Sequence, residues 1–347
     1  MQKYLLLSHS DLLKHGIDTH PENSGRLKAI FEEFERSPYK HHLDLTKNRL
    51  ATFEELSQVH DPLYVNTILS LEGKNCSLDS ETLLTPQSVR AALLAAGLGL
   101  ELIEQVIEGK IENGFALVRP PGHHARPGLG MGFCIFNNLA IAAKKALKMG
   151  LKRILIIDWD VHHGNGTQEM FYQHDRLLFI DIHQENLFPQ GSGLLNEKGE
   201  GKGLGFTVNI PLPQGCRDAD YFYLFDNLIK PLAVEYQPEL ILVSSGFDAH
   251  ESDPLGFMNL TTRDYRVLSN KVRKLAQQLC NGKLTFFLEG GYDPYFLAKN
   301  VMECVQMLMA TSLPIEEEEN QLSLESIKTL TDQIYEFHVK QISRKAR

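Results

Sequence analysis

Residues 154–165 read ILIIDWDVHHGN, and this stretch indicates both the fold class and the place of a functional site. An apolar run of strand length ends abruptly in aspartates and histidines before a glycine. Side chains of an extended strand alternate between its two faces, so Asp158, Asp160 and His162 should project to the same side. Neighbouring carboxylates repel each other and are costly to bury unless a cation lies between them. The pattern therefore predicts a metal site at a strand end.

Apolar runs of strand length alternate with helical patterns along the chain, which is typical of a parallel sheet covered on both faces. The predicted strands are residues 114–118, 153–157, 239–243 and 284–288, with 177–183 as a fifth. The predicted helices, with apolar residues three and four apart, are residues 88–108, 140–149, 220–236 and 264–279. We therefore expect a single α/β domain with a doubly wound sheet.

Four polar segments follow predicted strands and should meet at one edge of the sheet, where open α/β sheets bind their ligands. They are RPPGHH at 119–124, DWDVHHGN at 158–165, SSGFDAH at 244–250 and EGGYD at 289–293. In the first segment Pro-Pro-Gly cannot continue a strand, so it turns the chain and presents His123 and His124. A single histidine is more often a core residue, whereas an adjacent pair after a rigid turn indicates function.

A glycine-rich segment, GLGMGF at 128–133, follows the histidine pair. It does not open a helix directly after a strand, so it does not match a dinucleotide-binding fingerprint. Glycines here indicate close approach of the backbone to a ligand, with Phe133 as a wall. Asn137 or Asn138 is expected to cap the helix that follows.

The composition is that of an acidic globular protein, with 347 residues, a net charge of −9 and 43% hydrophobic residues. It contains no run of about 18 apolar residues that would span a membrane, and its start lacks the features of a secretory signal. The acidic balance gives no footprint for direct nucleic-acid binding. Without a C-x-x-C pair, the cysteines are expected to be reduced thiols of a cytoplasmic protein. They are Cys76, Cys134, Cys216, Cys280 and Cys304.

Taken together, the motifs resemble the histone deacetylase family, whose members have the arginase-deacetylase fold. RPPGHHA, GFCIFNN, DWDVHHGNGTQ, DIHQ, SSGFDAH and LEGGYD occur in the family's order, after His20-Pro21-Glu22 near the start. The resemblance extends to about residue 310 and implies a mostly parallel sheet of about eight strands with helices on both faces. The HPE opening, GFCIFNN and Asn165 are more similar to the class II and bacterial acetylpolyamine-amidohydrolase branch than to class I.

The resemblance implies one catalytic zinc ion, with Asp160, His162 and Asp248 as its ligands. Three protein ligands leave a coordination position open for water and substrate, as a catalytic zinc site requires. Such an ion acts as a Lewis acid and activates water. Two carboxylates and one imidazole can also hold iron(II) or cobalt, so zinc is expected from the family rather than from the ligand set.

The same resemblance implies that His123 and His124 transfer protons, that Asp158 orients His123 and that Asn165 lies beside His124. Because asparagine carries no charge, it should leave His124 less basic than aspartate would, which favours the neutral form of a general base. Tyr292 matches the tyrosine that donates a hydrogen bond to the oxyanion. Branches with histidine at that place are poor deacetylases, so the tyrosine indicates an active enzyme.

The family's substrate tunnel has two aromatic walls, which match Phe133 and Phe188, and a rim to which Asp79 is assigned as a contact for a cationic group or a peptide backbone. The full set of expected substrate-binding residues is Gly132, Phe133, Phe188, Gly290, Gly291 and Asp79. The family also has structural K⁺ or Na⁺ sites. The inner one matches Asp158, Asp160, His162, Asp181 and Ile182, and the outer one matches Phe171, His174, Leu177 and Phe206.

We therefore expect a zinc-dependent amidohydrolase that removes acetyl groups from lysine side chains of proteins such as histones and releases acetate. An acetylpolyamine amidohydrolase is the alternative, because the reactive group is the same. An arginase-type ureohydrolase needs a second metal ion, whereas Asp248 is followed by His250 rather than by another aspartate. His123, His124 and Tyr292 argue against an inactive acyl-lysine-binding module. A histone substrate would place the protein in the nucleus.

The C-terminal part differs in composition from the rest. We assign residues 1–312 to the catalytic domain and residues 313–347 to an acidic stretch, IEEEEN, followed by an amphipathic helix. The apolar face of this helix, from Leu324 to Phe337, is expected to dock on the same domain.

Overall fold

The structure is a computed structural model that describes residues 4–310 and 323–346. Within them, eight strands form one sheet in the order β2-β1-β5-β10-β9-β6-β7-β8, and all neighbours are parallel. The strands are β1 (Tyr4–Leu7), β2 (Leu43–Asp44), β5 (Asn113–Ala116), β6 (Ile154–Asp158), β7 (Leu177–Gln184), β8 (Thr207–Leu212), β9 (Leu240–Ser245) and β10 (Leu284–Leu288). β3 (Cys76–Ser77) and β4 (Leu83–Leu84) form a separate antiparallel pair.

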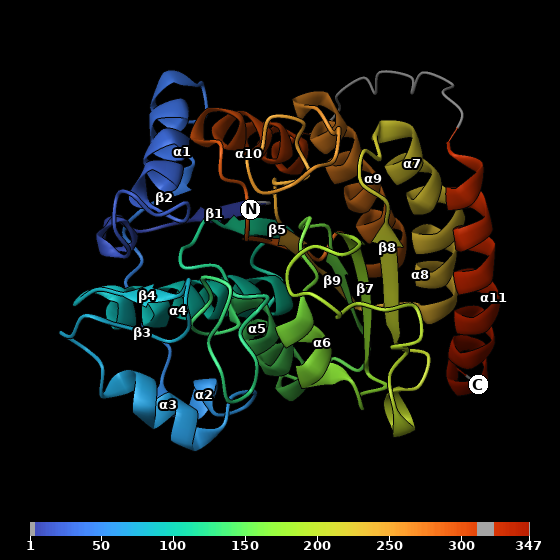
Figure 1. The fold of residues 1–347 in the computed structure, drawn as a ribbon, viewed down its shortest axis with the longest axis horizontal. Coiled ribbons are helices and arrows are strands. Elements are labelled where there is room, and N and C mark those ends of the chain that lie inside the picture. The colour runs from blue at the N-terminus through green and yellow to red at the C-terminus, as the bar shows by residue number, and fades with distance from the viewer. Residues whose placement is uncertain (1–3, 311–322, 347) are drawn as a thin grey trace.

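Helices cover both faces of the sheet, as predicted, and Figure 1 shows the two layers above and below it. One layer contains α4 (Ser88–Ile107), α5 (Asn138–Lys148) and α6 (Asn165–Phe171), with α2 (Phe53–Leu56) and α3 (Pro62–Leu69) outside them. The other contains α1 (Ser24–Arg36), α7 (Asp218–Leu224), α8 (Lys230–Tyr236), α9 (Thr262–Cys280) and α10 (Pro294–Met309). The short 3₁₀ segments are η1 (Ser10–Lys14) and η2 (Gly201–Gly203).

The central strands read as continuous apolar runs because helices bury both of their faces. All five residues of β6 are buried, and Asp158 at its end pairs in register with Asp181 of β7 and Ser244 of β9. The carboxyl ends of β5, β10, β9 and β6 therefore lie side by side. This adjacency brings the four predicted polar segments to one edge of the sheet.

The five predicted strands and four predicted helices are all present, and the structure adds strands that the patterns did not indicate. β2 has only two residues, and edge strand β8 contains Pro211, which weakens a strand pattern. The helix predicted over 220–236 is divided by a π-helical turn, η3 (Phe225–Ile229), directly before α8. Pro231 in the first turn of α8 lacks a backbone donor, which accounts for the altered hydrogen bonding there.

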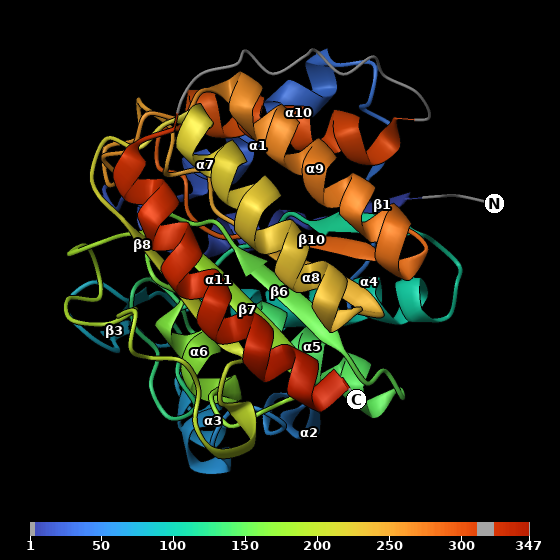
Figure 2. The same ribbon diagram turned by 90° about the vertical axis from the view of Figure 1, so that its right-hand side faces the viewer.

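The C-terminal helix α11 (Glu325–Ala346) packs along α8 and α7 and against edge strand β8, as Figure 2 shows. Its buried face includes Ile327, Ile334 and Ile342, whereas Leu324, which precedes the helix, is 49% exposed. The His338 ring bonds to the Gly205 carbonyl at 2.9 Å. The acidic stretch IEEEEN lies outside the described residues.

Two further features concern the helices and the cysteines. None of the helices in the described part of the chain is long and apolar enough to cross a membrane. All five cysteines are free thiols, four of them buried.

Candidate active site

Asp160, His162 and Asp248 form a buried cluster at the carboxyl edge of the sheet. One ligand atom from each lies within 4.8 Å of the others. The Nδ1 atom of His162 is 3.1 Å from an Asp160 oxygen and 3.0 Å from an Asp248 oxygen. Two carboxylates and an imidazole within this span are a suitable donor set for a divalent cation.

The local chain path that makes this cluster differs from the one predicted. β6 ends at Asp158, so Asp160 and His162 do not belong to a strand and are not aligned by its pleat. Instead, the Asp158 carboxylate accepts the Asp160 N–H at 3.1 Å, and the Asp160 carboxylate accepts the His162 N–H at 2.9 Å. Two successive turns of this kind bring Asp160 and His162 together. The predicted extended strand was wrong here, although the residues do converge.

Gly290 allows β10 to deliver its loop directly against the cluster. Its N–H donates to the Asp160 carboxylate at 2.8 Å. A Cβ atom at this position would lie only 2.0 Å from an Asp248 oxygen. Any other residue would displace the carboxylates, so Gly290 shapes the cluster. It does not line the substrate cavity.

The cluster strongly favours a positive charge. Burial opposes protonation of His162, but hydrogen bonds from its ring to Asp160 and Asp248 outweigh it and raise its pKa to about 10. A site that holds a proton this firmly between two carboxylates is chemically suited to a metal cation in the proton's place. The residues present therefore fit the predicted metal.

His123 is buried between the carboxylates of Asp158 and Asp160. Its Nδ1 is 3.2 Å from Asp158, and its Nε2 is 3.9 Å from Asp160. Burial alone would lower the pKa of His123, but the two carboxylates outweigh burial and raise it well above its usual range. His123 is thereby suited to keep a positive charge beside the cluster.

His124 has the opposite electrostatic environment. Its Nδ1 bonds to the amide oxygen of Asn165 at 2.8 Å, so Nε2 carries the lone pair when the ring is neutral. Burial, together with the positive charges of His123 and His162, holds the pKa of His124 well below its usual range. Two adjacent histidines therefore have pKa values pushed in opposite directions, which is typical of an acid–base pair.

Tyr292 faces the same space from the loop after β10. Its ring packs edge-on against Phe133, with centroids 5.7 Å apart, and against His162 at 6.5 Å. Burial raises the pKa of the Tyr292 hydroxyl well above its usual range, so it keeps its proton and remains a hydrogen-bond donor. The N–H of Tyr292 is fixed by the Asp253 carboxylate at 2.6 Å.

A cavity of about 350 Å³ leads to these groups. Phe133 and Phe188 both line it, and the Phe188 ring lies edge-on to His124 at 4.9 Å. Gly132 and Phe133 both have positive φ angles, 56° and 69°. A Cβ on Gly132 would be 2.5 Å from the His124 ring, so glycine keeps the passage open.

Several lining residues were not predicted from the sequence. The cavity is also lined by His20, Pro21, Ser80, Glu81 and Leu255. The HPE motif was the available signal for the first two, whereas no motif marked the others. The carboxylate of the predicted rim residue Asp79 accepts backbone N–H groups of Glu81, Thr82 and Gly132, so it supports the rim without lining the cavity.

A buried ion network under the cavity was also not predicted. Glu22 binds Arg119 with both oxygens, each at 2.7 Å, and Arg26 at 3.0 Å. Arg26 also donates to the carbonyls of Glu289 and Gly291, at 2.5 and 2.6 Å, and lies 4.9 Å from the Tyr292 ring centroid. This network fixes the loop that carries Tyr292.

Glu289 and Asn137 join the remaining motifs. The Glu289 carboxylate accepts the N–H groups of Gly122 and His123 at 2.6 and 3.1 Å, which anchors the turn that presents the histidine pair. Asn137 caps α5 by accepting the Ala140 N–H at 2.9 Å, which selects it over Asn138 as the capping residue.

The residues expected at monovalent-cation sites lie in two places. In the inner set, the Asp181 carboxylate accepts the Gly164 N–H at 2.8 Å and bonds to His183 at 2.6 Å, next to Asp158 in register. In the outer set, the carbonyls of Phe171 and Phe206 already accept backbone N–H groups at 2.9 Å. Each carbonyl retains a second lone pair.

Comparison with known proteins gives one consistent result. The family model described as histone deacetylase domain matches residues 20–308. A probable deacetylase of Archaeoglobus fulgidus is 41% identical, over 83% of this chain and 81% of its own length. A histone deacetylase-like amidohydrolase of Pseudomonas aeruginosa is 37% identical, over 80% of this chain and 73% of its own length.

Solved structures agree with the sequence matches. The crystal structure of the HDA15 HD domain superposes with a TM-score of 0.90 at 33% identity, covering 99% of this chain and 98% of that chain. The relatives are deacetylases or amidohydrolases, so the chain is a hydrolase. On this evidence of sequence and fold together, the chain belongs to the histone deacetylase family.

Proposed function

We propose that the protein is a zinc-dependent deacetylase that hydrolyses the acetyl amide of N-ε-acetyl-lysine in proteins such as histones. The observation that carries this proposal is the buried Asp160–His162–Asp248 cluster at the floor of a narrow aromatic cavity. The cluster would hold the ion through two carboxylates and one imidazole. When bound, zinc would supply Lewis-acid polarisation of the amide carbonyl and a lowered pKa for water.

The two histidines divide the proton transfers. His124, with its lowered pKa, is neutral and can accept a proton from the attacking water at Nε2. His123 keeps its proton beside Asp158 and stabilises negative charge that develops nearby. Once protonated, His124 can return its proton to the leaving amine, so that free lysine and acetate result.

Tyr292 would stabilise the developing oxyanion. Its hydroxyl keeps its proton, lines the cavity and belongs to a loop that Arg26 holds through two carbonyls. A hydrogen bond from such a preorganised donor counts most in a site that excludes water.

The cavity walls suit an aliphatic chain that ends in an amide. Phe133, Phe188 and Leu255 are apolar, and they can cover the methylene stem of lysine while its acetyl group reaches the cluster. Glu81 at the mouth is exposed and carries a negative charge. It can attract either a basic peptide or the distal amine of an acetylpolyamine, which is the second candidate substrate.

An assay panel separates these substrates. We would compare acetyl-lysine histone peptides, nucleosomes and acetylspermidine, each with chelator and with added zinc. The proposal predicts zinc-dependent acetate release with the highest kcat/KM on a peptide or protein. A preference for acetylspermidine would replace it with the polyamine reaction, and acetate release unaffected by chelator would contradict the role of the metal.

Two other functions are less favoured. An arginase-type enzyme would need a second metal ion, but His250 stacks on Phe296 at 4.4 Å and its Nδ1 accepts the Ser252 N–H at 3.1 Å. An acyl-lysine-binding module would bind the peptide without releasing acetate.

We further propose structural K⁺ or Na⁺ at the two backbone sites, which thermal unfolding in KCl, NaCl and tetramethylammonium chloride would test.

A further inference from the structure

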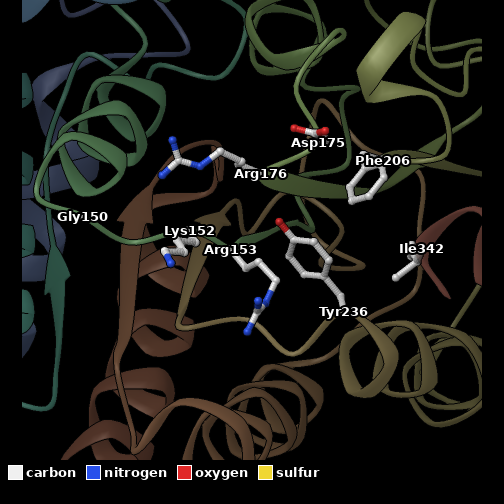
Figure 3. Close-up of a pocket in the computed structure, with 8 residues that line it drawn as sticks. All are labelled: Gly150, Lys152, Arg153, Asp175, Arg176, Phe206, Tyr236 and Ile342. Carbon is white, nitrogen blue, oxygen red and sulfur yellow. The ribbon is translucent and has the colours of Figure 1, made fainter. Parts of the chain in front are cut away.

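A second cavity opens at the opposite edge of the sheet. Its volume is about 490 Å³, compared with about 350 Å³ for the cavity at the active site. Figure 3 shows its lining, which comes from the segments that lead into β6, β7 and β8, from the end of α8 and from α11. The lining residues are Gly150, Lys152, Arg153, Asp175, Arg176, Phe206, Tyr236 and Ile342.

The charge of this lining opposes that of the whole protein. Three of its side chains, Lys152, Arg153 and Arg176, are cationic and only Asp175 is acidic, in a chain with a net charge of −9. The same positive charge acts on Lys144 of α5. Burial lowers the pKa of Lys144, and the charges of Lys148 and Arg176 lower it further. Positive charge has therefore accumulated here despite the repulsion it causes.

Donor capacity in the cavity is largely unused by the described residues. Arg153 donates from Nε to the Gln237 carbonyl at 2.7 Å, and Arg176 donates from one Nη to the Leu151 carbonyl. These bonds hold the two guanidinium groups in place but leave further N–H groups of each available. Lys152 makes no side-chain hydrogen bond or ion pair within residues 4–310 and 323–346, so its ammonium can meet a ligand.

The Tyr236 hydroxyl gives an independent indication of a ligand. Tyr236 is 2% exposed, and its hydroxyl donates to no acceptor among the described residues, although the backbone N–H groups of Ile154 and Leu178 lie near its oxygen. Figure 3 shows this oxygen pointing inward among the charged side chains, on the side away from Ile342. Burial raises the pKa of Tyr236 and outweighs the opposing effects of these N–H groups and of Arg153, so the hydroxyl keeps its proton. An unpartnered buried donor is costly, and a bound acceptor would remove that cost.

We propose that this cavity binds a small phosphorylated molecule. Arginine and lysine side chains bind phosphate oxygens, arginine in a bidentate manner, and the tyrosine hydroxyl adds one neutral donor. The rings of Phe206 and Tyr236, together with Ile342, give the cavity an apolar wall beside its cations. A phosphate attached to a ring, as in a nucleotide, satisfies both parts of the lining.

This site is separate from the proposed catalytic cluster. Arg153 precedes β6 and Asp158 ends it, so the five residues of the strand place the two edges about 16 Å apart. Binding can therefore be measured without any deacetylase assay. The proposal does not depend on which acetylated substrate the enzyme uses.

Isothermal titration calorimetry at fixed ionic strength tests the proposal with pyrophosphate, ATP and a short single-stranded RNA. Saturable binding of pyrophosphate or ATP is expected, and tighter binding of ATP would identify the apolar wall as part of the site. Sulfate at equal ionic strength serves as the control anion. Binding of the RNA alone, or of none of the three at millimolar concentration, would overturn the proposal.

Two variants assign the binding to this cavity. Lys152→Gln should weaken ATP binding by about tenfold, as expected for one charged hydrogen bond. Tyr236→Phe should weaken it by about two- to tenfold with little effect on the stability of the free protein, because the hydroxyl proton has no acceptor there. The matched control is Lys274→Gln, an exposed lysine at a different basic cavity. Equal effects of Lys274→Gln and Lys152→Gln would show non-specific charge binding and contradict the proposal.

Discussion

The two edges of the sheet carry opposite charge in opposite surroundings. At the carboxyl edge, the carboxylates of Asp158, Asp160 and Asp248 are at most 1% exposed, and histidines and backbone N–H groups contact them. At the amino edge, Lys152 and Arg153 are exposed and their charges face water. Charged groups packed without water need exact partners, whereas charged groups in water do not. The carboxyl edge should therefore respond far more strongly to substitution.

The largest expected effect is on stability, from Glu22→Gln. This change leaves the buried Arg26 and Arg119 without their counter-charge and should cost about 3–5 kcal/mol of unfolding free energy. Urea denaturation at neutral pH measures it. Glu32→Gln, on the helix α1 that carries Arg26, is the control, because its ion pair with Arg36 is exposed and should be worth less than about 1 kcal/mol. Equal costs would remove the contrast between buried and exposed charge.

The ionisation of Glu22 should also make the free energy of unfolding depend on pH. Although burial opposes ionisation, Arg119, His15 and Arg26 lower the pKa of Glu22 to about 2, from 4.5 ordinarily. A lowered folded-state pKa stabilises the protein above the unfolded-state value, and this stability is lost as the pH falls from about 4.5 to about 2. Denaturation curves across this range should show a smaller decline for Glu22→Gln than for the natural chain.

The next effect is on catalysis. Tyr292→Phe should retain the fold and the packing on Arg26 but lose about 2.7–4 kcal/mol of transition-state stabilisation, seen as a 10²–10³-fold lower kcat. Tyr295→Phe, at an exposed tyrosine three residues later, should leave kcat unchanged. If Tyr292→Phe kept near-full activity, the oxyanion role would be wrong.

Metal removal tests the cluster without any substrate. Zinc added to chelator-treated protein should raise the free energy of unfolding by about 2.7 kcal/mol when free zinc exceeds its Kd a hundredfold. Differential scanning calorimetry would record this as a higher Tm. Asp248→Asn should lose most of the increase, and an unchanged increase in that variant would place the zinc elsewhere.

A smaller effect is expected from Asn165→Asp. The added negative charge, 2.8 Å from the His124 ring, should raise the pKa of His124 from its lowered position. Because a general base must be neutral, the acidic limb of the kcat/KM profile should move to higher pH. Asn227→Asp, at an exposed site, is the control, and coinciding profiles for the natural chain and Asn165→Asp would contradict the proposed role of His124.

The smallest effect belongs to the amino edge. Lys152→Gln should change the free energy of unfolding by less than about 0.5 kcal/mol, because the side chain is exposed and has no partner among the described residues. A cost comparable to that of Glu22→Gln would mean that both edges depend on charge in the same way.

Much of the carboxyl edge could be predicted from the chain alone. Strands of a doubly wound sheet are apolar, and they end in the residues that reach the ligand, so β6 and its polar continuation were visible as sequence patterns. The order of the motifs then indicated the family, and with it the residues that now lie in the cluster. The convergence of Asp160 and His162 was predicted for the wrong local reason, because turns replace the expected strand.

Other features depend on partners far apart in the sequence. Glu22 and Arg119 are separated by 97 residues, and neither belongs to a pattern that predicts their contact. Likewise, the acidic composition concealed the basic cavity, since Lys152, Arg176 and Tyr236 meet only where β6, β7 and α8 come together. The sequence determined the strands, their polar ends and the family, because these follow from local periodicity and motif order. Tertiary structure alone decided which buried charges are paired and where cations gather, because those depend on strand order and packing.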